Sequence, residues 1–145
     1  MRIGQYSERA QRLLCLLYAL RELAGAPTKG EVLRFVREQR LLSLTDDDIA
    51  PYLTQTEERW TTDLAWRRKD GVQFGHVFNT NRDSWELTRD GRNFLEFAQA
   101  LAQQKRYDVT RCYLWSGVLK RIFDPEYQPS ATDAERPRRN EDFQV

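Results

Sequence analysis

The chain has few of the residues on which most metal and catalytic sites depend. Among its 145 residues there is one histidine, His76, and two cysteines, Cys15 and Cys112. A zinc site needs about four such ligands, in most cases closely spaced, so these positions cannot assemble one. The glycines are isolated, which excludes a phosphate-binding glycine loop, and the mid-chain serines lack the flanking glycines of a nucleophile elbow. We therefore expect no enzyme activity, no metal and no cofactor.

Long hydrophobic runs are also missing. No stretch approaches the roughly 18 apolar residues of a membrane helix. The N-terminus has no apolar segment beside a small-residue cleavage site, and the apolar run at residues 13–20 is short and closely flanked by charges. We expect a cytoplasmic protein without a membrane segment. In that compartment Cys15 and Cys112 should be buried, reduced thiols, and a redox pair is the alternative.

An excess of charge of one sign is missing too. The net charge is +1, although 31% of the residues are charged. Many DNA-binding domains are strongly basic, so the balance counts against a simple nucleic-acid role. The distribution is uneven, because residues 45–58 hold five acidic side chains and no basic one, whereas residues 1–44 hold eight basic and four acidic ones. Any non-specific affinity for DNA should therefore be modest and salt-sensitive.

What is present suits one compact, mainly α-helical domain with a small β-hairpin. The hydrophobic share is 40% and the aromatic share 12%, enough for a bulky core. Apolar periodicity predicts six helices, at about residues 8–24, 29–40, 46–53, 57–70, 89–104 and 108–123. The first has a wider apolar face than a surface helix needs, so we expect it in the core or in a dimer interface.

Helix starts are marked by three capping sequences. Thr28 with Glu31 and Thr54 with Glu57 have the spacing of a capping box, in which the two side chains satisfy free backbone amides. The acidic run 46–48 follows Thr45 and should favour the positive end of a helix dipole. Consecutive helical positions point in different directions, so we interpret the run as solvated acids and not as a metal site.

The stretch from residue 54 to residue 88 is the most informative part of the chain. A basic, threonine-rich helix is followed by two β-prone runs, at residues 74–78 and 84–88, with a polar tip at residues 79–83 between them. This order is typical of a winged helix-turn-helix, in which a helix enters the major groove and the hairpin lies along the backbone or the minor groove. Trp60 and Trp85 should be core residues, whereas Trp66 should be partly exposed.

Two motifs in this stretch resemble the N-terminal domain of the Mrr-type restriction proteins. Residues 59–60 and 64–67 resemble the family's Trp-Ala-Arg helix, although here the order is Ala-Trp-Arg. Residues 84–92 resemble its W-x-L-T-x-x-G pattern at the junction between wing and helix. The resemblance covers about half of the chain and implies a winged-helix DNA-binding domain. No nuclease domain follows, so cleavage is not implied.

The first functional hypothesis is binding of double-stranded DNA, as a small transcriptional regulator or a defence-associated module. Threonine and asparagine bond phosphates and base edges, and arginine bonds guanine with two hydrogen bonds. The candidate contacts on the helix and on the wing are Arg59, Thr61, Thr62, Arg68, Lys69, Asn79, Asn81 and Arg82.

The second hypothesis is a protein–protein interaction module on the same scaffold, such as a phage-borne inhibitor or a subunit of a complex. Leu114 and Trp115, facing away from the main apolar stripe of the last helix, would then form the docking surface. A homodimer is compatible with either hypothesis. The predicted organisation is a winged-helix domain at 1–104, an accessory helix at 105–123 and a disordered tail at 124–145, since the tail has mixed charge and little apolar content.

Overall fold

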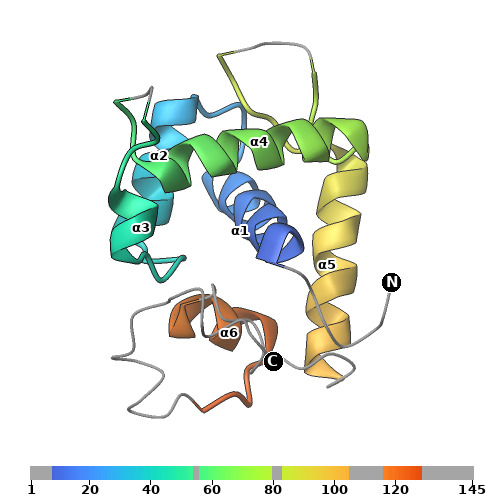
Figure 1. Cartoon of the computed structure of the whole chain (residues 1–145). Coiled ribbons are helices and arrows are strands. Elements are labelled where there is room, and N and C mark those ends of the chain that lie inside the picture. The colour runs from blue at the N-terminus through green and yellow to red at the C-terminus, as the bar shows by residue number, and fades with distance from the viewer. Residues whose placement is uncertain (1–7, 54–55, 80–82, 105–115, 129–145) are drawn as a thin grey trace.

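The computed structural model describes residues 8–53, 56–79, 83–104 and 116–128, and the structural statements below concern these residues. They form six helices: α1 (Glu8–Leu23), α2 (Lys29–Glu38), α3 (Asp46–Ile49), α4 (Arg59–Gln73), α5 (Arg89–Gln103) and α6 (Gly117–Phe123) (Figure 1). The prediction of a mainly α-helical protein is confirmed. None of these helices is long and apolar enough to cross a membrane.

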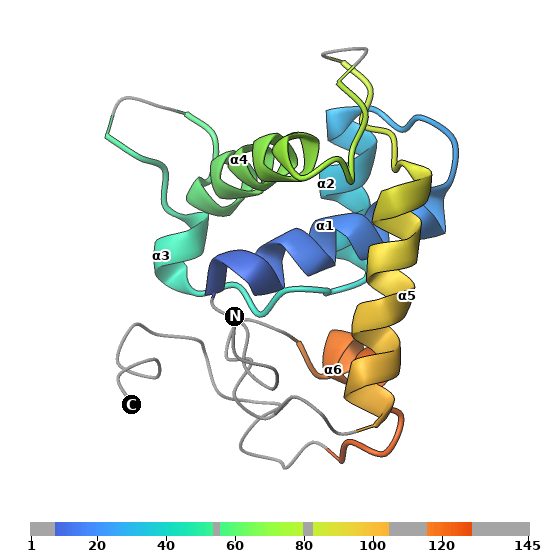
Figure 2. The ribbon, with the colours of Figure 1, turned by 90° about the vertical axis from the view of Figure 1, so that its right-hand side faces the viewer.

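Helix α1 is the centre of the core. Leu14, Leu16, Leu17 and Leu20 are each at most 1% exposed. Helix α4 crosses over α1, and α2 and α5 also contact it (Figures 1 and 2). Burial on several sides accounts for the wide apolar face of α1 without a dimer interface, because a helix surrounded by neighbours needs apolar residues all round.

The helix start at Thr28 is a capping box, as the spacing predicts, and Thr45 forms a second one with Asp48. The Thr28 hydroxyl accepts from the backbone N–H of Glu31 at 3.2 Å, and the Glu31 carboxylate accepts from the backbone N–H of Thr28 at 3.1 Å. Helix α4 begins differently, with Glu58 as a cap residue that makes no side-chain cap bond. Thr54, predicted to cap that helix, lies outside the described residues.

The sequence predicts that helix α4 stops at Gly71, but the helix continues to Gln73. Gly71 is buried, and a Cβ atom there would lie 2.7 Å from Cγ2 of Val77. Its missing side chain therefore admits the segment that follows the helix, and this close approach explains the glycine.

Helix α3 is shorter than predicted, because it ends at Ile49 and not near Leu53. Ala50 is extended, with ψ at 139°, as expected for a residue that precedes proline. Pro51 then forms an isolated antiparallel bridge with Glu58, and the N–H of Arg59 donates to the carbonyl of Ala50 at 3.1 Å. The proline thus turns the chain from α3 toward the start of α4.

The two β-prone runs do not form strands in the described residues, so the predicted hairpin is not confirmed. Val77 and Leu87 form one isolated antiparallel bridge, flanked by a 2.9 Å hydrogen bond from the N–H of Phe78 to the carbonyl of Glu86. Phe74, predicted to begin a strand, is the C-cap of α4. The pairing is short because residues 74–76 form the cap and turn that follow α4, which leaves only the end of the first run to pair.

The W-x-L-T-x-x-G pattern has a structural reason at each position. Trp85 and Leu87 are buried, at 3% and 8% exposure. The Thr88 hydroxyl accepts from the N–H of Gly91 at 2.9 Å and donates to the carbonyl of Gly75 at 2.7 Å. A Cβ atom on Gly91 would lie 2.2 Å from the carbonyl oxygen of His76. The motif therefore fixes the start of α5 against the segment that follows α4.

The C-terminal region differs from the predicted helix at 108–123. Residues 105–115, with Cys112, Leu114 and Trp115, lie outside the described part. Helix α6 begins at Gly117, and Ser116 before it is extended and caps it. Packed structure also continues beyond the predicted boundary at residue 124. Tyr127 is 8% exposed, and the centre of its ring lies 5.4 Å from Nζ of Lys120.

The close approach at Gly91 gives a stability prediction. Replacement Gly91→Ala should lower the free energy of unfolding by about 2 kcal/mol or more, because the backbone oxygen of His76 must move. Gly30→Ala is the matched control, since only the Thr28 hydroxyl lies near that position, at 3.9 Å, and it should stabilise by about 0.5 kcal/mol. Urea denaturation measures both, and equal effects of the two replacements would contradict the contact.

Candidate nucleic-acid interface

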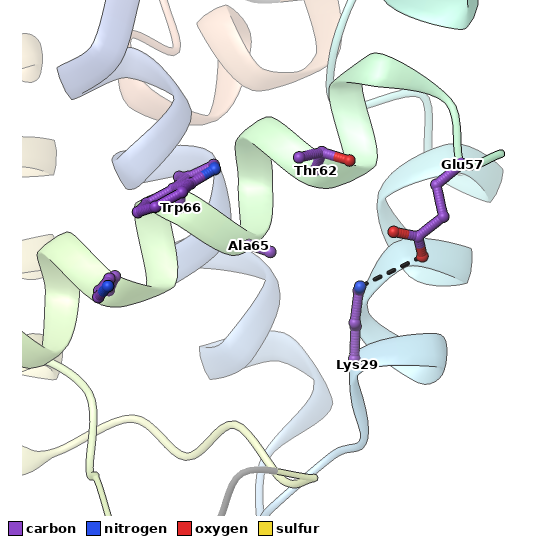
Figure 3. Close-up of a pocket in the computed structure, with 6 residues that line it drawn as sticks. Lys29, Glu57, Thr62, Ala65 and Trp66 are labelled. Carbon is purple, nitrogen blue, oxygen red and sulfur yellow. Dashed lines mark hydrogen bonds and ion pairs between the residues drawn. The ribbon is translucent and has the colours of Figure 1, made fainter. Parts of the chain in front are cut away.

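Helix α4 has one buried face and one open face. Trp60 and Leu64 are at most 1% exposed and hold the helix against the core. A shallow groove lies along the opposite face, and it is lined by Lys29, Glu57, Thr62, Ala65, Trp66 and Lys69 (Figure 3). At one end of the groove Nζ of Lys29 forms an ion pair with Oε1 of Glu57 at 3.2 Å.

Trp66 is the largest side chain on the open face. It is 52% exposed, as the sequence predicts, and Nζ of Lys69 lies 4.9 Å from the centre of its ring. Thr62, one helical turn earlier, is half-buried. The three side chains follow helical spacing and therefore share one stripe. The stripe combines a hydroxyl, an indole and an ammonium group on the outside of the molecule.

The arginines of α4 contact protein groups beside this stripe. The guanidinium carbon of Arg59 lies 4.5 Å from the ring centre of Tyr52. The guanidinium carbon of Arg68 lies 5.9 Å from the ring centre of Trp85. Both side chains are half-buried, as Thr62 is. Each guanidinium group faces an aromatic ring, where the ring face attracts the cation.

Thr61 is a correction to the predicted contact set. It is 9% exposed, and its hydroxyl donates to the carbonyl of Glu58 at 2.7 Å. A helix turns about 100° per residue, so Thr61 points inward where its neighbour Thr62 does not. On the predicted wing, Asn79 is exposed, whereas Asn81 and Arg82 lie outside the described residues.

The acidic residue before α4 has a structural role that the sequence did not indicate. The Glu58 carboxylate accepts from Nε1 of Trp60 at 2.7 Å and also pairs with Arg37 of α2. The Arg37 guanidinium lies 5.5 Å from the ring centre of Trp60. These contacts join α2 to the first turn of α4. A glutamate two residues before a buried tryptophan was the only sequence signal.

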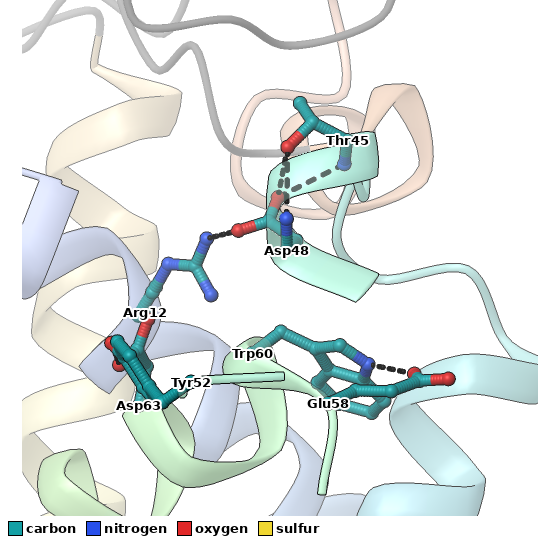
Figure 4. Close-up of polar contacts among 7 residues, drawn as sticks. All are labelled: Arg12, Thr45, Asp48, Tyr52, Glu58, Trp60 and Asp63. Carbon is teal, nitrogen blue, oxygen red and sulfur yellow. Dashed lines mark hydrogen bonds and ion pairs between the residues drawn. The ribbon is translucent and has the colours of Figure 1, made fainter. Parts of the chain in front are cut away.

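A second polar cluster joins α1 to α3 (Figure 4). Nη2 of Arg12 donates to Oδ1 of Asp48 at 2.9 Å, and the Arg12 side chain is 3% exposed. The Asp48 carboxylate also accepts from the backbone N–H of Thr45 at 3.0 Å. The prediction of solvated acids is therefore wrong for Asp48, although Asp46 and Asp47 are exposed. In the described part of the chain no three His, Cys, Asp or Glu residues could hold a metal ion.

A third polar cluster fixes the inward side of α4. Asp70 is 6% exposed, and its two carboxylate oxygens accept from Arg9 at 2.6 and 2.9 Å. The bonds from Arg9 hold the pKa of Asp70 below its usual value, with a smaller contribution from the Arg67 charge. Nε of Arg67 lies 2.9 Å from Oδ2 of Asp70, which explains an arginine on the inward side of the helix.

His76 is packed at the junction between α4 and α5. Its ring stacks on Phe94 at 4.5 Å between centres, and its Nδ1 atom is buried without a hydrogen-bond partner. Burial lowers the pKa of His76, and the nearby Asp90 charge opposes this shift. Such a histidine stays neutral near pH 7 and acts as a stacking residue.

Cys15 is a free thiol with no exposed surface. Burial raises its pKa to about 12, so the reactive thiolate is not populated at neutral pH. The expectation of a buried, reduced thiol is confirmed for Cys15.

No protein-family model matches the chain, and neither a curated protein nor a solved structure does. The resemblance to the Mrr-type domain therefore stays a prediction from residues 59–60, 64–67 and 84–92.

The buried ion pair gives a second stability prediction. Asp48→Ala should lower the free energy of unfolding by about 3 kcal/mol, because it leaves the Arg12 charge buried without its carboxylate partner. Asp47→Ala, in the same turn but exposed, should cost at most about 1 kcal/mol through the helix dipole. Thermal or urea unfolding measures the stability of both variants. Similar losses of stability would show that the ion pair adds nothing beyond the interaction of an acidic residue with the helix dipole.

His76 predicts the pH dependence of stability. A pKa lowered in the folded state means that the unfolded chain binds the proton more tightly, so protonation favours unfolding. The stability is therefore complete above the usual value of 6.5 and falls as the pH drops below it. Urea denaturation from pH 7.5 to 5.5 should show this loss, and His76→Gln should reduce it because the chain has no other histidine. Parallel profiles for the two proteins would contradict the assignment.

Proposed function

We propose that the chain is a DNA-binding protein of winged-helix type, which presents α4 to the major groove of double-stranded DNA. The observation that carries this proposal is the two-sided character of α4. Trp60 and Leu64 hold it in the core, while Thr62, Trp66 and Lys69 lie along its open side. A major groove about 12 Å wide accepts one α-helix, whose outer residues then meet the base edges.

The backbone pairing around α4 supports the winged-helix part of the proposal. The N–H of Trp85 donates to the carbonyl of Pro27 at 2.7 Å, and Thr28 forms an antiparallel bridge with Ser84. The bridge between Val77 and Leu87 lies a few residues further along the same segment. The segment before α2 thus pairs with the segment before α5, which pairs with the segment after α4. This pairing supports the proposal, because a winged helix has a three-stranded sheet at the base of its wing.

The charges near the open face are compatible with contact to phosphates. The two acids before α4 are already paired, Glu57 with Lys29 and Glu58 with Arg37. Lys69 is exposed on the stripe itself. Pairing reduces the repulsion that these carboxylates would exert on DNA. With a net charge of +1, the affinity should be modest and local to this face. Such a module fits a small transcriptional regulator or a defence-associated protein of the cytoplasm.

A protein-interaction module is the second candidate, and exposed aromatic residues favour it. Phe74 and Phe97 are 63% and 60% exposed. The Phe74 ring lies 6.1 Å from that of His76, which stacks on Phe94, one helical turn before Phe97. Exposed aromatic surface near the end of α4 and along α5 is typical of an interface with a partner protein or a second copy.

The DNA-binding proposal predicts a salt-dependent interaction that Lys69 contributes to. Fluorescence anisotropy with a labelled duplex should show binding that weakens between about 50 and 200 mM salt. Lys69→Ala should weaken it and reduce the slope of log K against log salt by about one. Arg121→Ala is the matched control. Arg121 is also exposed, but it lies on α6, at the other end of the molecule from α4 (Figure 1), and its loss should change neither quantity.

Two results would contradict DNA binding by α4. The first is no measurable binding at either salt concentration, and the second is an equal effect of Lys69→Ala and Arg121→Ala. A dimer in sizing chromatography that Phe97→Ser dissociates, together with absent DNA binding, would favour the interaction module instead.

A further inference from the structure

We propose that the open stripe of α4 recognises A·T base pairs, by placing the Trp66 indole against the C5 methyl groups of thymine in the major groove. The inference depends on the proposed entry of α4 into that groove, and it adds the class of sequence that is bound. Two observations support it: Trp66 is exposed on the stripe, and the arginines of α4 contact other protein groups.

The stripe is apolar at its centre. Ala65 and Trp66 lie between Thr62 and Lys69, so a methyl group and an exposed indole occupy the middle of the groove in Figure 3. In the major groove the thymine methyl is the apolar feature of the base-pair edges, and the other features are hydrogen-bond donors and acceptors. A surface with an indole at its centre gains most from the methyl, because contact removes apolar area of both from water.

The arginines of α4, which would read guanine, are directed elsewhere. Arg59 lies over the Tyr52 ring and Arg68 over the Trp85 ring. Arg67 is 17% exposed and pairs with the buried Asp70. Guanine is read chiefly by two hydrogen bonds from such a cation to O6 and N7. Arg59, seven residues before Trp66, shares its face of the helix, but its guanidinium group lies against the Tyr52 ring. From Thr62 to Gln73 the stripe therefore presents no guanidinium group.

Gln73 strengthens the preference for the same base pair. It is exposed in the last turn of α4, seven residues after Trp66, and so lies on the same face of the helix. Glutamine is the side chain that bonds adenine through N6 and N7. Trp66 would contact thymine and Gln73 would contact adenine, and both contacts select A·T pairs over G·C pairs.

Lys69 has a separate role on the stripe. Its ammonium group lies 4.9 Å from the Trp66 ring centre, where the cation is attracted by the ring face. Lys69 is exposed, so the same ammonium group can contact a phosphate while its stem covers the indole. A phosphate contact adds affinity without selecting sequence. Replacing Trp66 and replacing Lys69 should therefore have different effects.

The test compares two duplexes that differ only in the C5 methyl group. One is an A·T-rich duplex, and the other has deoxyuridine in place of every thymidine. The full chain should bind the thymine duplex more tightly, by about fourfold for each methyl that is buried. Trp66→Ala should bring the two affinities together and leave the salt slope unchanged. Lys69→Ala should weaken binding to both duplexes equally and preserve their ratio.

The outcomes separate this inference from the proposed function. Equal binding of the two duplexes by the unmodified chain overturns thymine recognition and leaves DNA binding in place. A preference that survives in Trp66→Ala assigns discrimination to DNA shape and also overturns the role of Trp66. No binding to either duplex overturns both proposals. Circular dichroism of Trp66→Ala, expected to match the unmodified chain because the residue is half exposed, excludes misfolding as the cause of a loss.

Discussion

The buried pair between Arg12 and Asp48 joins the central helix to α3, from which the chain leads to the candidate site. Arg12 belongs to the central helix, and Asp48 closes the capping box of α3. From α3 the chain turns at Pro51, which bridges to Glu58 at the start of α4. The ion pair and the turn therefore add to the direct packing of α4 on α1 in fixing the start of that helix. Separating the two charges would be costly, because the Arg12 side chain is buried.

The last turn of α4 is fixed by an ion pair and by a close contact at a glycine. Asp70 pairs with Arg9, and next to it Gly71 admits Val77 against the helix. Gly91 admits the carbonyl of His76 against α5, and the Thr88 hydroxyl caps α5 and bonds the carbonyl of Gly75. Polar contacts therefore hold both ends of α4, and Trp66 lies on the open face between them.

Local signals predicted the structure well, and distant partners account for the errors. The capping box at Thr28 and the helix start at Thr45 depend on residues at most three positions apart, so the sequence alone indicates them. Asp48 was interpreted as solvated because its partner Arg12 lies 36 residues away. Gly71 was interpreted as a helix stop because the approach of Val77 becomes visible only in three dimensions.

The candidate site shows the same division between local and distant effects. Trp66 was correctly expected to be exposed, since it lies away from the periodic apolar positions. Thr61 was assigned to the surface with Thr62, although one residue on a helix separates the inward from the outward side. The contacts of Arg59 and Arg68 join α4 to two aromatic rings elsewhere in the chain, Tyr52 and Trp85. No spacing rule within a helix predicts such contacts. They matter for function, because they decide which side chains remain on the stripe.

The two close glycines differ in how a change at each could be compensated during evolution. At Gly71 the neighbouring atom belongs to the Val77 side chain, so a smaller residue at position 77 could make room for a larger one at 71. At Gly91 the neighbour is the backbone oxygen of residue 76, which every amino acid has. No second substitution can remove that atom. Position 91 is thus open to change only through movement of the backbone, whereas position 71 can vary together with its partner.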